Sequence, residues 1–325
     1  MVIIHGASSH DDFVPMIPDE RPEATVSALG RLEDYNIELT NVPSMWRHTR
    51  GRGVKIAILD TGVPRHRDVS VAGCKSFIPG YLDDENGHVT GVGSIVSGTG
   101  TGGTGVRGVA PEAEDYYGAV LNASGAGSAS TVARGIRWAV DEVGADVINL
   151  SLGIPASNGQ APAIAKACGY AYSKGVTVVA AAGNDGDEVN CPASLDTVIA
   201  VAAVDRRLRH ASFSSHGPEV EFAAGGVDVA MAYLNNGYAT MSGTSFSAPV
   251  ISGLAALVIS RHKAMGEERL PPDKVRDALR GIARDIGPNG RDEYTGWGIP
   301  MFSQDRDAGS RGTALGRWLK RVFSR

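Results

Sequence analysis

The feature that most constrains this chain is a continuous apolar run ending in a carboxylate, VKIAILD at residues 54–60. Such a run, without polar alternation, is typical of a parallel strand buried on both faces of its sheet. Similar runs occupy Asp115–Leu121, Val147–Leu152, Val176–Ala182 and Val198–Ala203, with helical patterns at Ser130–Val143 and Ala161–Lys174 between them. A further helical pattern covers residues 272–284. Strands that alternate with helices predict an α/β fold: a doubly wound, mostly parallel sheet with helices on both faces.

Charge and cysteine content limit the partners and the compartment. The net charge is -5, so the chain lacks the basic field that nucleic-acid binding requires, and we expect no nucleic-acid partner. Cys74, Cys168 and Cys191 are odd in number and widely spaced, which favours neither a disulfide framework nor a zinc site. A reducing compartment is the simplest interpretation.

The N-terminal residues do not resemble a targeting segment. MVIIHGASSH lacks a basic region, and its apolar run is too short for a signal peptide. No later stretch approaches the roughly 20 apolar residues of a spanning helix. We therefore expect no membrane span and a cytoplasmic location, while the sequence leaves the oligomeric state open.

Three segments organise the chain. Residues 1–41 form an N-terminal extension that mixes charge and proline, with one short helical pattern around Thr25–Tyr35. Residues 42–302 form the main domain. Residues 303–325 form a basic tail with interleaved apolar side chains, for which a frayed terminal helix, a membrane surface contact and a partner contact are all open.

Three polar residues fall where such a sheet binds ligands, outside the carboxyl ends of its strands. Asp60 ends the first buried strand, His88 lies in NGHVTGVGSIV, and Ser245 precedes FSAPVISGLAALVISRH, a buried helical pattern. Taken alone, each has a structural explanation as a cap or a satisfied polar residue. The pattern around them decides between these interpretations.

The order Asp, His, Ser and its surrounding motifs resemble the subtilisin family. The resemblance spans about residues 42–300, through the motifs ILDTG, GVRGVAP, INLSLG, VVAAAGNDG, VIAVAAVD, ASFSSHGP and MSGTSFSAP. It implies a subtilisin-like three-layer architecture and a serine endopeptidase that cleaves unfolded or loop segments of proteins, with no cofactor in the chemistry. The layout is closest to the intracellular branch of the family.

The resemblance implies a role for each polar residue. Ser245 is the nucleophile, His88 the base that takes its proton, and Asp60 the carboxylate that orients His88. Asn184, in AAAGNDG, corresponds to the asparagine that donates to the oxyanion of the tetrahedral intermediate.

The family's peptide-binding segments can be placed in the same way. Ser151, Leu152 and Gly153 resemble one edge of the substrate cleft, and Gly125, Ala126 and Gly127 the other, so that a peptide would add between them as a strand. Asp185 makes the rim acidic, which suggests a preference for basic residues before the scissile bond or merely a solvated loop. VPMIPDE at residues 14–20 is a candidate inhibitory segment.

Two departures from the family pattern are visible. The usual His-Gly-Thr-His-Val is here His88-Val89-Thr90-Gly91-Val92, so a branched side chain replaces a glycine and the second histidine is lost. Asp68 resembles a ligand of the family's structural calcium, but the partner loop GTGGTGVRG lacks the usual asparagine, leaving backbone carbonyls and Thr101 as donors.

Two other functions stay open on the same residues. The chain could be a catalytically weak or inactive binding protein on the same scaffold, since fold does not prove activity. It could also be an acyl hydrolase of small esters, which shares the chemistry but needs no segments to grip a peptide.

Overall fold

A seven-stranded parallel sheet forms the centre of the protein, in the strand order β10-β9-β8-β7-β3-β5-β4. The computed structural model describes residues 14–17, 24–26, 35–100, 105–155, 161–266 and 269–302. The strands are β3 Lys55–Asp60, β4 Gly73–Ser76, β5 Glu114–Ala119, β7 Val147–Leu150, β8 Thr177–Ala181, β9 Val198–Val204 and β10 Val220–Gly225. The predicted α/β class is confirmed, and all five predicted strands are present within two residues of their expected bounds.

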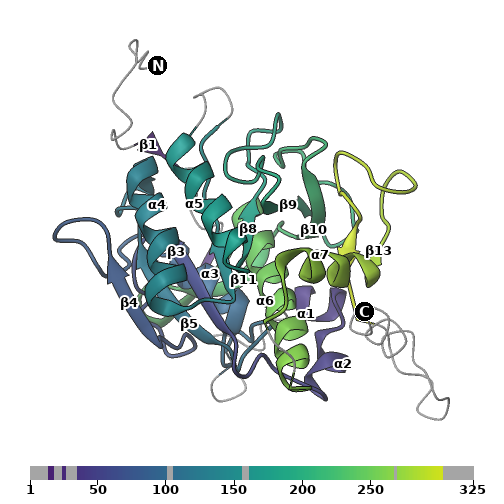
Figure 1. Ribbon diagram of the computed structural model, residues 1–325, viewed down its shortest axis with the longest axis horizontal. Helices are drawn as coiled ribbons and strands as arrows, with labels where there is room; N and C mark the ends of the chain where they lie inside the picture. The colour runs from purple at the N-terminus through teal and green to yellow at the C-terminus, as the bar shows by residue number, and fades with distance from the viewer. Residues whose placement is uncertain are drawn as a thin grey trace.

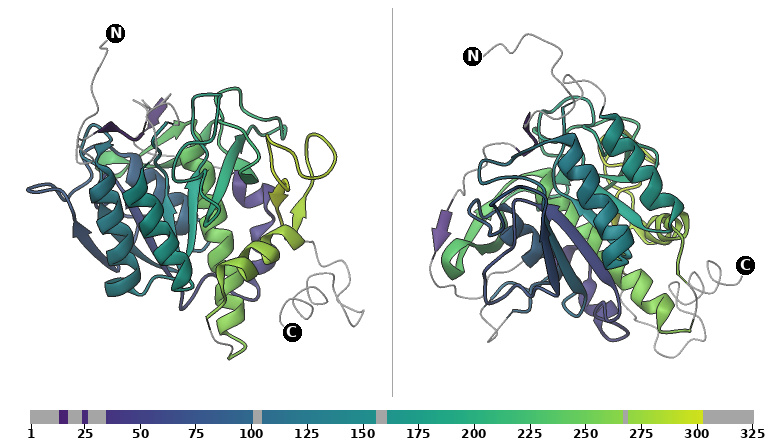
Figure 2. Two further views of the ribbon diagram at one scale, coloured as in Figure 1. Left: turned by 45° about the horizontal axis from the view of Figure 1, so that its top comes forward. Right: turned by 60° about the vertical axis from the view of Figure 1, so that its left-hand side comes forward.

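Helices cover both faces of this sheet, as Figures 1 and 2 show. α4 Ala129–Trp138 and α5 Pro162–Ser173 lie side by side on one face, and α3 His88–Ser97 and α6 Thr244–Lys263 pack on the other. Successive side chains of β3 alternate between the two cores: Ile56 and Ile58 belong to the α3/α6 side, Ala57 and Leu59 to the α4/α5 side. This alternation is why the interior of β3, between Lys55 and Asp60, has no polar positions.

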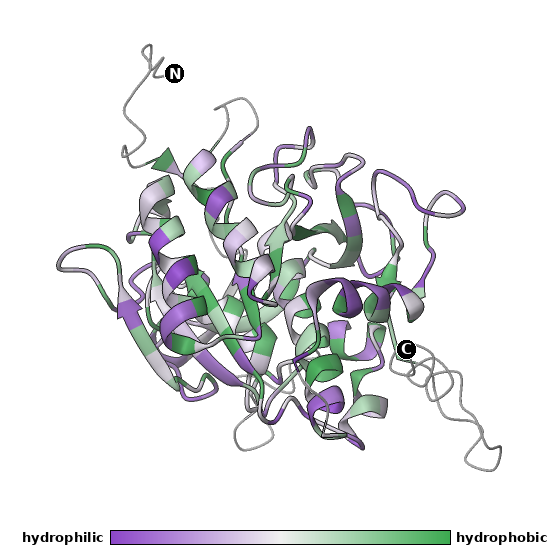
Figure 3. Cartoon of the chain, in the orientation of Figure 1, coloured by the Kyte–Doolittle hydropathy of each residue, from purple (hydrophilic) through white to green (hydrophobic). Residues whose placement is uncertain are grey.

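α6 runs through the interior of the molecule. Of its 20 residues, 18 are buried, whereas α4 alternates apolar and polar faces, as the colouring of Figure 3 shows. By length and hydropathy alone α6 would qualify as a membrane span, but 94% of the relevant window is buried inside the protein. Its apolar character is accounted for by the core.

Most helices follow the predicted patterns, with informative differences at their ends. The helix predicted after Ser245 begins one residue before it, at Thr244. The pattern at Ser130–Val143 divides into α4 and a π-helical turn, Ala139–Val143. The helix expected over residues 272–284 ends earlier, as α7 Pro272–Gly281, because Ala283–Arg284 pair as β13 with β14 Ile299–Pro300.

The first two described segments of the N-terminal extension, residues 14–17 and 24–26, contain β-strands, so the helix predicted from Thr25 is wrong at its start. β1 Val14–Pro15 pairs with β6 Ala126–Gly127. The helical pattern expected around Thr25–Tyr35 fails at its start, because β2 Ala24–Val26 adds to the hairpin of β11 Val229–Tyr233 and β12 Gly237–Met241, joined by a 3-10 turn at Leu234–Asn236.

Two short helices then lead into the main domain. They are α1 Tyr35–Leu39 and α2 Val42–Trp46. Residues 27–34, the rest of that helical pattern, and the basic tail at 303–325 lie outside the described residues.

Candidate active site

The carboxylate of Asp60 and the ring of His88 meet at the carboxyl edge of the sheet. Asp60 is the last residue of β3, and His88 is the first residue of α3. His88 Nδ1 lies 2.7 Å from Asp60 Oδ1, and both side chains are buried, with 1% and 0% exposed. Asp60 Oδ1 also accepts from the backbone N–H of Thr61 at 2.6 Å. A buried carboxylate so held fixes the orientation of the imidazole and places a proton on its Nδ1.

Ser245 is brought to the same place by the first turn of α6. The ring of Phe246, the next residue, lies 5.6 Å from the ring of His88. The backbone of Ser245 is tied to the adjacent strand, because Ser151 Oγ donates to the Ser245 carbonyl at 2.7 Å and accepts from Asn149 Nδ2 at 2.9 Å. The carboxyl end of the strand segment around Asn149 and Ser151 therefore fixes the backbone of Ser245, which is distant from it in sequence.

Asn184 follows β8 and is oriented by the residue before Ser245. Its Oδ1 accepts from both the backbone N–H and the hydroxyl of Thr244, each at 2.8 Å. With the oxygen end of the amide fixed in this way, the NH₂ group is its donor end. The structure places Asn184, Thr244 and Ser245 on the wall of one cavity of about 220 Å³.

Residues 14–17 of the N-terminal extension lie between the two predicted peptide-binding segments, and Pro15, Met16 and Ile17 form part of the wall of this cavity. Val14 and Pro15 pair antiparallel with Gly127 and Ala126. The N–H of Met16 donates to the Gly125 carbonyl at 3.1 Å, and the carbonyl of Met16 accepts from the Gly153 N–H at 2.8 Å. Residues 125–127 on one side and Gly153 on the other thus bind one extended segment through main-chain groups.

Side chains of the extension add an apolar fit to this pairing. Met16 and Ile17 are 3% and 5% exposed. Gly125 has a φ of +74°, and a Cβ there would stand 2.3 Å from Cγ1 of Ile17, so only glycine permits both this turn and the contact. The extension is packed against the cleft as well as hydrogen-bonded to it.

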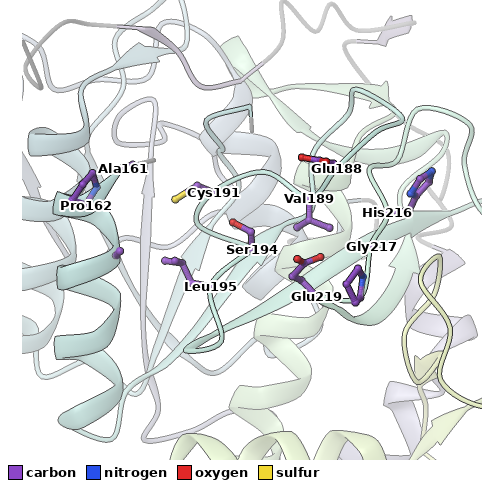
Figure 4. Close-up of a pocket in the computed structure, with 12 residues that line it drawn as sticks. Ala161, Pro162, Glu188, Val189, Cys191, Ser194, Leu195, His216, Gly217 and Glu219 are labelled. Carbon is purple, nitrogen blue, oxygen red and sulfur yellow. The ribbon is translucent and has the colours of Figure 1, made fainter. Parts of the chain in front are cut away.

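A larger cavity lies behind the wall of the cleft. It has a volume of about 790 Å³, and Val189 and Cys191 line it (Figure 4). Asn190, between them in sequence, lines the smaller cavity. Asn190 Nδ2 donates to Asp185 Oδ2 at 2.9 Å, which joins the predicted acidic rim to this wall. Because Asn184 and Ser245 line the smaller cavity and not the larger one, the smaller one is the candidate site.

The departures beside His88 are absorbed by the packing of α3. The side chain of Val89 is fully buried in the core that α3 shares with α6. At Gly91 a Cβ would stand 2.4 Å from Sδ of Met231, so a methionine from β11 fills the space where the family pattern has a second histidine. The altered motif therefore leaves the Asp60–His88 hydrogen bond intact.

Asp68, the predicted calcium ligand, is enclosed by protein donors. Its Oδ2 accepts from the hydroxyl of Tyr238 at 2.8 Å and from the N–H of Val106 at 3.1 Å. Among the described residues no group of three acidic, histidine or cysteine side chains suits a metal ion, and Thr101 lies outside them. Calcium at Asp68 stays a prediction.

Asp115 is another buried carboxylate outside the candidate site. Asp115, on β5, accepts from Ser97 Oγ and, at 3.1 Å, from the hydroxyl of Tyr117. Burial raises the pKa of Asp115 to about 7. Asp115 therefore binds the last residue of α3, the helix whose first residue is His88.

The residues that hold the site were missed by reasoning from sequence. Thr244 donates to Asn184, and Asn149 donates to Ser151. Their one visible signal was position: each stands within two residues of a predicted site residue, at a strand end or a helix start.

Comparison with known proteins agrees with this geometry. The family model described as the subtilase family matches residues 51–298. The chain therefore belongs to the subtilase family, and its enzyme class is that of a serine-type endopeptidase.

Individual relatives differ in how much of them the chain covers. It is 42% identical to subtilisin DY of Bacillus licheniformis over 246 residues, which are 73% of this chain and 86% of that protein. It is 37% identical to the minor extracellular protease Epr of Bacillus subtilis over 276 residues, 83% of this chain but 41% of Epr. It is 44% identical to a thermostable alkaline protease of Halalkalibacterium halodurans over 216 residues, 65% of this chain and 58% of that protein.

Proposed function

We propose that this chain hydrolyses peptide bonds through Asp60, His88 and Ser245. The observation that carries the proposal is the buried 2.7 Å hydrogen bond between Asp60 and His88, beside the helix start that holds Ser245. A serine hydroxyl is a weak nucleophile, and an imidazole oriented by a carboxylate is the group that activates it near neutral pH.

The proposed reaction has two acyl-transfer steps. Ser245 Oγ bonds to the carbonyl carbon while His88 Nε2 takes the hydroxyl proton, and Asp60 stabilises the resulting imidazolium. His88 then gives that proton to the leaving amine as the C–N bond breaks, which leaves an acyl-enzyme. Water, deprotonated by His88, cleaves the ester, and the proton returns to Ser245.

Asn184 is the proposed side-chain donor to the developing oxyanion. Its carbonyl end is occupied by Thr244, so the amide NH₂ is the end that can donate. The backbone N–H groups of the first turn of α6 support the same charge, because a helix N-terminus carries partial positive charge.

The proposed substrate is an extended protein segment bound between residues 125–127 and 151–153. Support comes from the extension, whose residues 14–17 make main-chain hydrogen bonds to both edges. Main-chain pairing ignores sequence, which suits a peptidase acting on unfolded or loop segments. We further propose that the extension inhibits the enzyme, because substrate cannot enter while Met16 and Ile17 fill the cleft.

The test compares casein degradation by the wild-type chain and by Ser245→Ala. A peptidase degrades casein and loses that activity in the variant. Hydrolysis of nitrophenyl acetate without casein degradation would favour an acyl hydrolase of small esters. Casein binding without degradation by either chain would favour the inactive binding protein.

The calcium proposal at Asp68 has a separate test. If an ion bound there stabilises the fold, EDTA lowers the melting temperature of the Ser245→Ala chain and added CaCl₂ restores it. An identical melt with and without chelator contradicts the proposal.

A further inference from the structure

α3, the helix that presents His88, begins without a cap from its own N-cap residue. That residue is Gly87, whose φ is +94° and whose Cβ would collide with the ring of Tyr233. A helix start leaves N–H groups that need acceptors. Here three neighbours supply them: Asn86 Oδ1 for His88 N, Thr61 Oγ1 for Val89 N and Asp84 Oδ2 for Thr90 N, each at 3.2 Å.

Asp84 accepts far more hydrogen bonds than a cap requires. Its Oδ1 accepts from the Gly87 N–H at 2.9 Å, the Thr61 hydroxyl at 3.0 Å and the Asn86 N–H at 3.1 Å. Its Oδ2 accepts from the Thr90 hydroxyl at 2.6 Å as well as from the Thr90 N–H. Five donors thus converge on one side chain.

These bonds join the two elements that carry Asp60 and His88. Thr61 directly follows Asp60, and its N–H donates to Asp60 Oδ1. Its hydroxyl donates to Asp84 and accepts from the helix N–H of Val89. The backbones of the two segments are also paired, since Asp84 N donates to the Val63 carbonyl at 3.0 Å. Asp84 is therefore bonded on one side to the end of β3 and on the other to the first turn of α3.

We propose that Asp84 is a positioning residue that holds the Asp60 and His88 side chains in the register needed for proton transfer. Its carboxylate touches neither the reacting atoms nor the cavity wall. The inference rests on the proposed peptidase function. Asp84 replaces the missing cap of α3 and is connected to Asp60 through Thr61.

Only an acceptor-only group satisfies this arrangement. Asparagine would keep one oxygen but present an NH₂ group to the donors around Oδ2. Burial raises the pKa of Asp84, while the bonds from Thr90, Gly87 and Thr61 oppose that shift. A carboxylate before the helix start also interacts favourably with the helix dipole.

The test measures kcat and KM per active site in Asp84→Asn, with sites titrated by a fluorophosphonate. We expect kcat to fall about 10²-fold, the typical cost of misplacing a catalytic group by about 1 Å, with KM nearly unchanged. Asp83→Asn is the matched control, because Asp83 is the neighbouring carboxylate and makes an exposed ion pair with Arg65. It should leave both constants at their wild-type values.

A second pair of variants guards against misfolding of Asp84→Asn. Thr90→Val removes the 2.6 Å hydroxyl bond and should lower kcat, whereas Thr90→Ser keeps a hydroxyl and should restore most of it. In the Ser245→Ala chain, the NMR signal of the His88 Nδ1 proton should shift or broaden in Asp84→Asn and not in Asp83→Asn.

The outcomes separate this inference from the proposed function. If the wild-type chain neither reacts with the fluorophosphonate nor cleaves peptide, the peptidase proposal fails. If the wild type is active and Asp84→Asn only lowers the titrated fraction or the melting temperature, with kcat per site and the NMR signal unchanged, Asp84 is merely structural and the inference is overturned.

Discussion

Replacing Ile17 by alanine tests whether the extension holds the cleft closed through its side chains. Ile17 is 5% exposed and packs on Gly125, where no side chain intervenes. The substitution removes three buried carbon groups, each contributing about 0.8 kcal/mol, so undocking becomes easier by about 2.4 kcal/mol. That shifts the equilibrium between docked and undocked extension by about 60-fold.

The expected result is a higher initial rate with the extension still attached. The rate of the full chain on a peptide nitroanilide should rise by up to about 60-fold, limited by the rate of a chain lacking residues 1–20. Intact mass at each time point verifies that the extension has not been cleaved. Val71→Ala is the control, because Val71 is 40% exposed and lies outside the cleft.

Two results would refute this reasoning. If the chain lacking residues 1–20 is folded and no faster than wild type, the extension does not inhibit. If that chain is faster but Ile17→Ala matches Val71→Ala, inhibition does not depend on the packing of Ile17 against Gly125.

Three other perturbations have defined outcomes. Asn184→Ala should lower kcat by about 10²–10³ with little change in KM, the loss measured for the corresponding donor of subtilisin itself; an unchanged kcat in a stopped assay would remove Asn184 from the oxyanion site. Asp115→Asn should change how stability depends on pH. The folded chain keeps a proton on Asp115 that the unfolded chain releases, so this contribution is present at low pH and is lost as pH rises toward about 7. Urea unfolding should be compared in the Ser245→Ala background with and without Asp115→Asn. Between about pH 5 and about pH 8 the free energy of unfolding should fall by about 2 to 3 kcal/mol more in the chain that keeps Asp115, and parallel curves of that free energy against pH would argue against the prediction. Cleavage profiling on a peptide library should enrich Lys and Arg before the scissile bond, less so for Asp185→Asn; no enrichment in the wild type ends the proposed preference.

The sequence predicted the fold well where burial leaves a strong pattern. β3, β7, β8 and β9 are mostly apolar because both of their faces are covered, and such runs are visible without any structure. β4 and β2 lie at sheet edges and carry no such pattern, so they were missed. The helical pattern at Thr25 gave way to pairing with β12, a long-range contact that local sequence does not encode.

For the candidate site, motif order identified the residues but not what orients them. Asp60 and His88 are 28 positions apart, and only the fold supplies their 2.7 Å hydrogen bond. The convergence of five donors on Asp84 depends on bringing Thr61 beside the start of α3. Met231 fills the space beside Gly91 where the family pattern has a histidine side chain, and these two residues are 140 positions apart in sequence.

The most direct measurement is peptide mapping of the full chain after reaction with a fluorophosphonate. We expect one phosphonyl group per molecule, on Ser245, with labelling abolished in Ser245→Ala and strongly slowed in His88→Ala. The reaction should be faster in Ile17→Ala, which opens the cleft. The proposed triad would be contradicted if neither the folded full chain nor the folded chain lacking residues 1–20 is labelled. Labelling at a serine other than Ser245 would also contradict it.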